Sequence, residues 1–195
     1  MALIAQSLVT ADEIDGVLQT QNATYDAVIE QLANAVSQEF ATYAGRLFIS
    51  AVYTSVKLTG DGTSRLLLPA WPVTVLTSVV EDTVTRVVDV DFYADMDNGI
   101  LTKAEYNWPW YDEYAVWTTK TQAIVVTYTG GYAQASLPWD LKQAALDEIA
   151  YRYQRFVLKE WGAASRSQEG SSTSFKELEK PDWQRVVRQY RRWRL

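Results

Sequence analysis

Residues 123–150 read AIVVTYTGGYAQASLPWDLKQAALDEIA, and this stretch changes from a strand pattern to a helix pattern within a few positions. Its first part, Ala123 to Thr129, is rich in β-branched residues and ends at Gly130-Gly131, which predicts a strand followed by a turn. Pro138 suits the first turn of a helix, where its missing amide costs nothing. From there to about Trp161, apolar residues recur three and four apart. The stretch therefore predicts a long amphipathic helix that directly follows a sheet.

Two helices are predicted near the start of the chain. Thr10 and Glu13 have the spacing of a capping box, in which each side chain satisfies a backbone amide at the start of a helix, here residues 11–18. A second helix is predicted over residues 24–43, because its apolar residues form a single stripe. Gly45 is placed to end that helix in a left-handed conformation.

The residues between these helices and the long one, 46–132, have the alternating pattern of strands. Short strands are predicted at 52–58, 65–68, 73–80, 83–90, 100–103 and 123–129. We therefore predict an α+β fold. It is a helical bundle, built from the N-terminal helix pair and the long C-terminal helix, with an inserted small antiparallel β-sheet or sandwich and a C-terminal tail helix.

The sequence divides into three parts on this interpretation. Residues 1–161 form the main domain, with helices at 11–18, 24–43 and 138–161. Residues 162–180 are rich in Gly, Ala and Ser at their start, which predicts a flexible linker. Pro181 then opens a basic helix that runs to Leu195.

The composition excludes several classes of function. The chain has no histidine and no cysteine, so Ser-His-Asp triads, Cys-His pairs, zinc clusters and disulfides are ruled out, and folding in a reducing cytoplasm is expected. Met1 to Gln6 lack the pattern of a signal peptide, and no apolar run is long enough to span a membrane. Phosphate-binding glycine motifs are absent as well. We predict no catalytic residue, no cofactor and no metal, and a carboxylate-based hydrolase is the weakest hypothesis because it requires two acidic residues converging in one cleft.

One acidic stretch, Asp91 to Gly99, resembles a calcium loop only superficially. A calcium loop needs oxygen ligands at its first, third and fifth positions, but here the fifth position is Gly99. A hairpin turn is the better interpretation. Asp89 and Asp91 are predicted to share one face of a strand at a solvated sheet edge.

The charge is unevenly distributed along the chain. Residues 1–141 contain 6 Lys and Arg against 17 Asp and Glu, whereas residues 142–195 contain 12 against 7. An acidic body does not favour tight DNA binding, which depends on cations that neutralise phosphates. A basic tail on an acidic body suits a subunit whose tail docks onto an acidic neighbour.

An aromatic cluster lies between the predicted strands of the insertion. Three hypotheses remain open for it: a subunit interface, part of the sheet core, or a platform on which sugars stack. Asp112 and Glu113 lie within the cluster, which favours a partly exposed interface over the core. The cluster comprises Tyr106, Trp108, Trp110, Tyr111 and Tyr114, together with Trp117.

The C-terminal helix interleaves arginines with aromatic residues. Such a pattern can bind nucleic acid, but Arg, Trp and Tyr are also the residues enriched in protein-interface hot spots. Docking onto a protein is the favoured hypothesis, because a helix on a flexible tether suits a groove on a partner. The docking residues are predicted to be Trp183, Arg185, Arg188, Tyr190, Arg191, Arg192, Trp193 and Arg194.

Several motifs, taken in order over roughly residues 8–160, resemble the head-tail connector family of tailed bacteriophages, also called adaptor or head-completion proteins. After residue 162 the chain does not match the family pattern, so the role of its tail rests on composition alone. The motifs are the helix pair ending in Tyr43-Ala-Gly-Arg-Leu-Phe48, Leu68-Pro-Ala-Trp-Pro-Val73 with Glu81-Asp82, Tyr93 ahead of Gly99-Ile100, Trp108-Pro109, Val125-Val-Thr-Tyr-Thr-Gly-Gly-Tyr132 and Leu137-Pro-Trp-Asp-Leu-Lys-Gln-Ala144.

The resemblance implies a non-enzymatic virion protein, made in the host bacterial cytoplasm and located at the head-tail interface. Such proteins assemble as a ring, usually of twelve copies, below the portal protein. The ring extends the DNA channel and offers a platform for a stopper or tail-completion protein, with helices around the channel and the β insertion outward. Viral DNA would pass through it without sequence-specific binding, and no membrane is involved.

Two further expectations complete the interpretation. The acidic body would repel DNA phosphates and let the genome slide, while the basic tail would dock on the lower rim of the portal. The alternative is a phage tail or baseplate module that binds host carbohydrate through the aromatic cluster.

Overall fold

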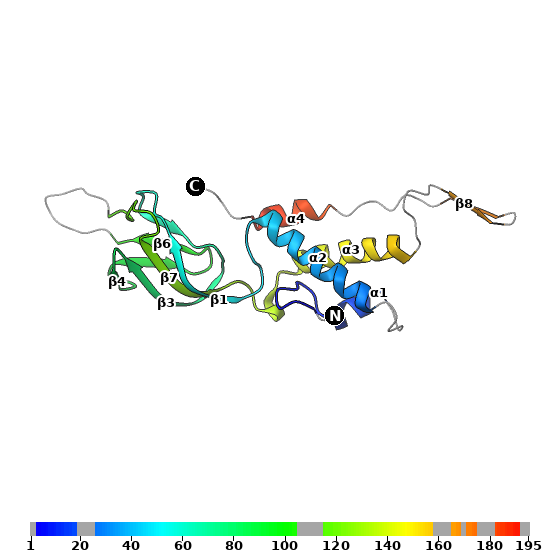
Figure 1. Ribbon diagram of the computed structural model, residues 1–195, viewed down its shortest axis with the longest axis horizontal. Coiled ribbons are helices and arrows are strands. Elements are labelled where there is room, and N and C mark those ends of the chain that lie inside the picture. Colours follow the sequence, from blue (N-terminus) through cyan, green and yellow to red (C-terminus); the bar gives the residue numbers. More distant parts are fainter. Residues whose placement is uncertain are drawn as a thin grey trace. The chain divides into compact units, whose positions relative to one another are not determined.

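The computed structural model describes residues 3–18, 26–104, 115–157 and 182–191, and the backbone of 165–168 and 171–174. The chain divides into two compact units. The helical unit contains residues 1–46 and 136–195, and the β unit contains residues 47–135. Figure 1 shows helices in the first and strands in the second. The structure thus combines helices with antiparallel sheets, as the sequence predicts.

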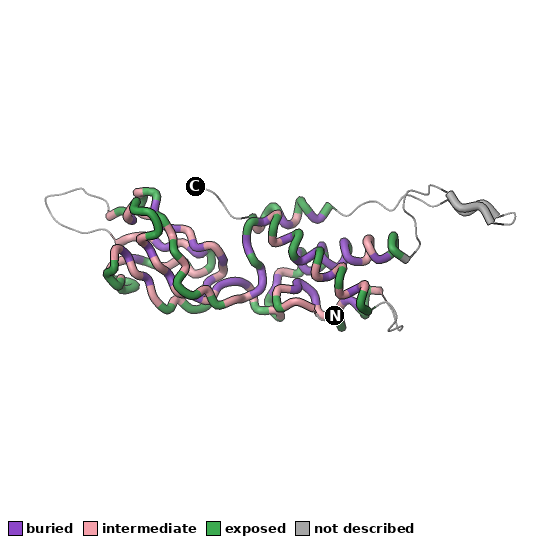
Figure 2. Tube along the Cα trace, in the orientation of Figure 1, coloured by how far each residue is buried: buried purple, intermediate pink, exposed green. Residues whose placement is uncertain are grey.

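Four α-helices lie in the described part of the helical unit. They are α1 (Ala11–Leu18), α2 (Asp26–Ala44), α3 (Trp139–Val157) and α4 (Trp183–Gln189). The helix α3 contacts each of the other three, and α2 also contacts α4. Figure 2 colours the buried positions of the trace purple. The buried residues of these helices include Ile14, Ile29, Val36, Phe40, Leu141, Ala145, Ile149, Tyr153, Trp183 and Val187.

Local sequence signals set the ends of the first two helices. The Thr10 amide donates to Glu13 Oε2 at 2.9 Å and the Glu13 amide donates to Thr10 Oγ1 at 3.3 Å, so the predicted capping box is confirmed. Gly45 has a φ of 70°, the predicted left-handed conformation, directly after α2. The Arg46 amide then donates to the Ala41 carbonyl at 3.1 Å and closes the helix end.

Replacing Thr10 with alanine is expected to lower the free energy of unfolding of the helical unit by about 1 kcal/mol, because an N-terminal amide of α1 loses its acceptor. Urea unfolding followed by circular dichroism measures this loss. Thr42→Ala is the matched control, since the Thr42 hydroxyl only donates to the Gln38 carbonyl on the exposed side of α2. Equal losses in the two variants would contradict a capping role for Thr10.

Ion pairs connect helices that are distant in sequence. Lys142 Nζ lies 2.6 Å from Glu13 Oε1 and ties α3 to the start of α1. Partial burial acts to raise the pKa of Glu13, but hydrogen bonds from Lys142 and Thr10 outweigh it and hold the pKa below its usual value. Arg152 Nε donates to Glu148 Oε1 at 2.7 Å within α3, and its Nη2 pairs with Glu39 on α2.

The described residues of the β unit, 47–104 and 115–135, form two antiparallel sheets. The first has the strand order β1-β7-β3-β4, from β1 (Ala51–Leu58), β7 (Ile124–Gly130), β3 (Val73–Glu81) and β4 (Val84–Arg86). The second has the order β2-β6-β5, from β2 (Arg65–Leu67), β6 (Ile100–Lys103) and β5 (Phe92–Asp95). The short 3₁₀ helix Gln134–Ser136 follows β7 in the chain.

One hydrophobic core joins the two sheets. Along β7, alternate residues are buried, so this central strand turns one face fully inward. Residues from both sheets meet there: Leu66, Leu68, Ala70, Val73, Val79, Phe92, Leu101, Trp117, Ile124, Val126 and Tyr128.

The region around β4 and β5 differs from the prediction. The strand predicted at 83–90 is shorter, because β4 ends at Arg86 and the Val87 amide donates to Asp91 Oδ2 at 2.7 Å in a turn. Asp89, with a φ of 63°, also lies in this turn, so the prediction that Asp89 and Asp91 share a strand face is wrong. The strand β5 is not predicted from the sequence. The hairpin interpretation of 91–99 is confirmed, since β5 and β6 pair antiparallel across it.

The C-terminal part differs in two ways. The segment predicted as a linker contains two short paired strands, β8 (Ser165–Gln168) and β9 (Ser171–Ser174), whose Ser and Thr residues tolerate an extended backbone. The helix predicted to reach Leu195 ends earlier, because α4 stops at Gln189 and the Tyr190 amide bonds back to the Val187 carbonyl at 3.0 Å. Residues 192–195 lie outside the described residues.

Candidate functional site

The helix α4 is held by its apolar side against the rest of the helical unit. Trp183, only 3% exposed, stacks on Phe40 of α2 with ring centroids 4.6 Å apart. The same indole makes an edge contact with Tyr43 at 5.3 Å. Val187, one turn further along, is fully buried. The helix therefore contributes its aromatic face to the core of its own chain.

The opposite side of α4 exposes positively charged side chains to solvent. Arg185 and Arg188 are exposed on the helix, and Arg191 is exposed just after it. Arg188 hydrogen-bonds the Tyr43 hydroxyl, which raises the pKa of the guanidinium above its usual value, so its charge is constant. The Tyr190 hydroxyl donates to Asp140 Oδ1 of α3 at 2.7 Å and fixes the end of the helix.

The predicted docking residues therefore fall into three groups. Trp183 is buried within its own chain, and Tyr190 is half-buried against α3. The exposed group, here called the arginine ridge, consists of Arg185, Arg188 and Arg191. Arg192, Trp193 and Arg194 lie outside the described residues.

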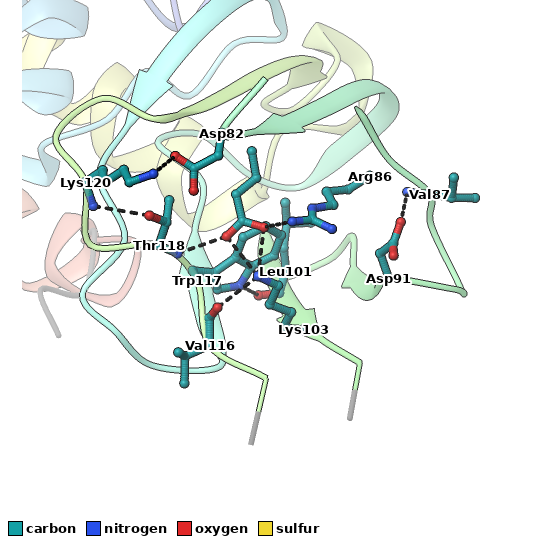
Figure 3. Close-up of polar contacts among 11 residues, drawn as sticks. Asp82, Arg86, Val87, Asp91, Leu101, Lys103, Val116, Trp117, Thr118 and Lys120 are labelled. Carbon is teal, nitrogen blue, oxygen red and sulfur yellow. Dashed lines mark hydrogen bonds and ion pairs between the residues drawn. The ribbon is translucent and has the colours of Figure 1, made fainter. Parts of the chain in front are cut away.

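A buried ion-pair cluster organises the other candidate region, in the β unit. Glu81, at the end of β3, is 2% exposed. Its carboxylate accepts from Lys103 Nζ at 2.8 and 2.7 Å, pairs with Arg86 Nη2 at 2.9 Å and accepts from the Thr118 amide at 2.9 Å. Figure 3 labels Lys103, Arg86 and Thr118 and marks these contacts with dashed lines. We call these four residues the Glu81 cluster.

The Glu81 cluster joins both ends of the segment that contains the predicted aromatic interface. Lys103 precedes that segment and Val116 follows it, and Lys103 Nζ donates to the Val116 carbonyl at 2.8 Å (Figure 3). The positions of these two residues are thus fixed relative to each other. The interface residues themselves, Tyr106, Trp108, Trp110, Tyr111 and Tyr114, lie outside the described residues.

Trp117, the last member of the aromatic cluster, is a core residue. It is fully buried, its Nε1 donates to the Leu101 carbonyl at 3.2 Å, and its ring packs on Phe92 with centroids 5.9 Å apart. Lys103 Nζ lies 5.1 Å from the centre of the same ring. The interface interpretation is therefore wrong for Trp117, because its indole fills the space between the sheets.

The sequence motifs include Glu81 only as part of the pair Glu81-Asp82 and do not identify it as an organising residue of the β unit. A signal was present: Glu81 lies two residues after Val79, a buried residue of β3, and therefore on the same face of the strand. A charged residue at such a position needs a buried partner. The partners Lys103 and Thr118 come from distant parts of the sequence, so they could not be identified in advance.

The part of the chain that the structure describes contains no cluster of three or more acidic side chains placed to bind a metal ion. Within the same ranges, no helix combines the length and the apolar character needed to cross a bilayer.

Three solved structures share the fold. The chain matches a chain of the neck of an empty gene transfer agent (GTA) particle computed with C6 symmetry, with a TM-score of 0.59, covering 100% of this chain and 95% of that one. It also matches chains of the neck of a native GTA particle computed with C12 symmetry and of the native GTA virion, with TM-scores of 0.52 and 0.51, covering 94% of each. The sequence identity is 16% in all three.

No curated protein matches the chain. A family model does match, and it covers residues 7–193, which is nearly the whole sequence. Its description, head completion protein, agrees with the resemblance found in the sequence motifs. The expectation that the family pattern ends at residue 162 is wrong, because the match continues to residue 193. The chain therefore belongs to the head completion protein family.

Proposed function

We propose that this protein is a non-enzymatic subunit of the neck of a tailed phage or phage-like particle. Its copies form a ring below the portal, extend the DNA channel and provide the platform for a stopper or tail-completion protein. The observation that carries this proposal is the family match over residues 7–193. The neck chains of similar fold, found in particles with C6 and C12 symmetry, support a ring of twelve copies.

The charge of the chain agrees with a channel for DNA. Residues 1–141 carry 17 acidic against 6 basic side chains, so the body repels the phosphates of a passing genome. DNA therefore moves through the ring without sequence-specific binding.

Two surfaces are assigned to protein contacts in this ring. The aromatic segment with Tyr106, Trp108, Trp110, Tyr111 and Tyr114 contacts the neighbouring subunit, and the Lys103–Val116 contact holds the two flanks of this segment together. The arginine ridge, with Arg192 and Arg194 beyond it, docks on the acidic lower rim of the portal. Arginine forms bidentate bonds with carboxylates, which suits this role.

Electron microscopy of the protein mixed with its cognate portal tests the proposal. We expect a cyclic assembly with twelve copies of this chain on one side of the portal, because a ring lets each copy use two different surfaces and leaves none open. A portal from an unrelated phage serves as the control and should recruit no ring. A protein that remains monomeric beside its cognate portal would contradict the proposal.

A further inference from the structure

The conformation of α4 depends on its contact with α2 and α3. With seven residues, the helix is too short to be stable by itself in water. Its order comes from Trp183 and Val187, which are buried against the unit, and from the Tyr190–Asp140 hydrogen bond at 2.7 Å. Only in this docked state do Arg185 and Arg188, three residues apart, lie on one exposed helix face.

The length of the chain does not force α4 to stay docked. Residues 165–174 of the preceding segment fold back on themselves as the β8–β9 pair, and the remaining 14 residues between 158 and 181 could span roughly 45–50 Å if fully extended. Two modes of portal binding are therefore open. In one, α4 leaves its groove and inserts its apolar face into a partner. In the other, it stays in place and presents only its arginines.

Burial and charge favour the second mode. Departure of α4 would expose Trp183 and Val187, and it would also uncover Phe40, which is fully buried in the docked state. The docked helix already presents a fixed row of cations, so binding carboxylates from this state avoids the entropy of ordering a free tail. The exposed Arg185, Arg188 and Arg191 offer guanidinium groups that form bidentate bonds with carboxylates, so an acidic protein surface is the complementary partner.

We infer that α4 remains docked against α2 and α3 when the protein binds its partner, so that the binding surface is the arginine ridge and the partner is an acidic protein surface. The inference rests on the proposed function, in which that partner is the portal. Trp183 is then a positioning residue, which holds the arginines in place without contacting the portal.

A reversible crosslink tests this inference. Because the chain has no native cysteine, only the introduced cysteines can react with the crosslinker. Asp140 and Tyr190, which contact each other across α3 and α4, are both replaced with cysteine and joined by a short bis-methanethiosulfonate. Affinity for the cognate portal is measured by biolayer interferometry before and after reduction. We expect the crosslinked and reduced forms to bind within about threefold of each other.

Two further variants separate the roles of Trp183 and the ridge. Trp183→Ala should weaken portal binding at least tenfold in the uncrosslinked protein, although every arginine is retained. Arg185→Ala, Arg188→Ala and Arg191→Ala combined should weaken it at least as much, even in the crosslinked protein. The matched control is Gln184→Ala with Gln189→Ala, two exposed positions on the same helix, and it should bind normally.

The outcomes are distinguishable. Portal binding that is lost on crosslinking and restored by reduction would overturn the inference while leaving the proposed function intact. Portal binding by the Trp183→Ala variant that equals wild-type binding would also overturn the inference and leave the proposed function intact. If the combined arginine substitutions abolish binding of duplex DNA but leave portal binding unchanged, the partner of the arginine ridge is nucleic acid, and the inference is overturned. A wild-type chain that does not bind the portal would contradict the proposed function itself.

Discussion

Replacing Glu81 with alanine is expected to lower the free energy of unfolding of the β unit by about 3–5 kcal/mol, the usual effect of removing one partner from a buried ion pair. The carboxylate is 2% exposed and is shared by Lys103 and Arg86, which stay partly buried when it is removed. The Thr118 amide loses its acceptor as well. Urea unfolding, with hydrogen exchange of peptides from β7 and α3, measures the effect and shows whether it is confined to the β unit.

The adjacent residue provides a matched control. Asp82 also pairs with a lysine, Lys120, at 3.0 Å, but both side chains are exposed to water. Asp82→Ala should therefore leave the stability of the β unit close to that of the wild type. Glu81→Gln, which keeps the shape and an acceptor but removes the charge, should fall between the two alanine variants. If Glu81→Ala and Asp82→Ala prove equally mild, the Glu81 cluster does not stabilise the fold.

The other large effect is expected at Trp117. Trp117→Ala should destabilise the β unit by about 3–5 kcal/mol, because it removes a fully buried indole between the two sheets. Replacement also leaves the Leu101 carbonyl without its hydrogen bond from Nε1. The measurement is the loss of exchange protection in β6 and β7, compared with protection in α3.

Trp139 is the control for this substitution. It begins α3 with 77% of its surface exposed, and its ring lies 5.2 Å from Lys142 Nζ. Trp139→Ala should therefore cost at most about 1 kcal/mol, the size of an exposed cation–π contact. A Trp117 variant as stable as the Trp139 variant would refute a core position for Trp117.

Much of the local structure could be predicted because it depends on residues close in sequence. The capping box at Thr10 and Glu13 and the left-handed Gly45 are decided within a few positions. The alternating pattern of residues along β7 likewise indicates which face of the strand is buried. The turn at 87–91 differs from the prediction, because its residues have strand-like character but form turn hydrogen bonds. These include the bond from the Val87 amide to Asp91 Oδ2 and the bond from the Asp91 amide to the Val87 carbonyl.

The candidate sites could be predicted only in part. Composition correctly drew attention to the arginines and aromatic residues of the C-terminal segment. It could not distinguish Trp183, which is buried, from Arg185, which is exposed, because a helical stripe of apolar residues fits the core of its own chain and a groove on a partner equally well.

By itself, the sequence determined the α+β class, the order of the helices and of most strands of the β unit, and the family resemblance, because periodicity and short motifs are properties of neighbouring residues. It did not reveal β5, β8 or β9. Tertiary structure alone decided that Trp117 and Trp183 lie inside the protein and that Glu81 is paired with Lys103 and Arg86. The physical reason is that a large ring is stable in the interior only when neighbouring side chains fill the space around it. A charge is stable there only when a partner of opposite charge or a hydrogen bond balances it. Folding brings Lys103 to Glu81, and Phe40 to Trp183, from distant parts of the chain.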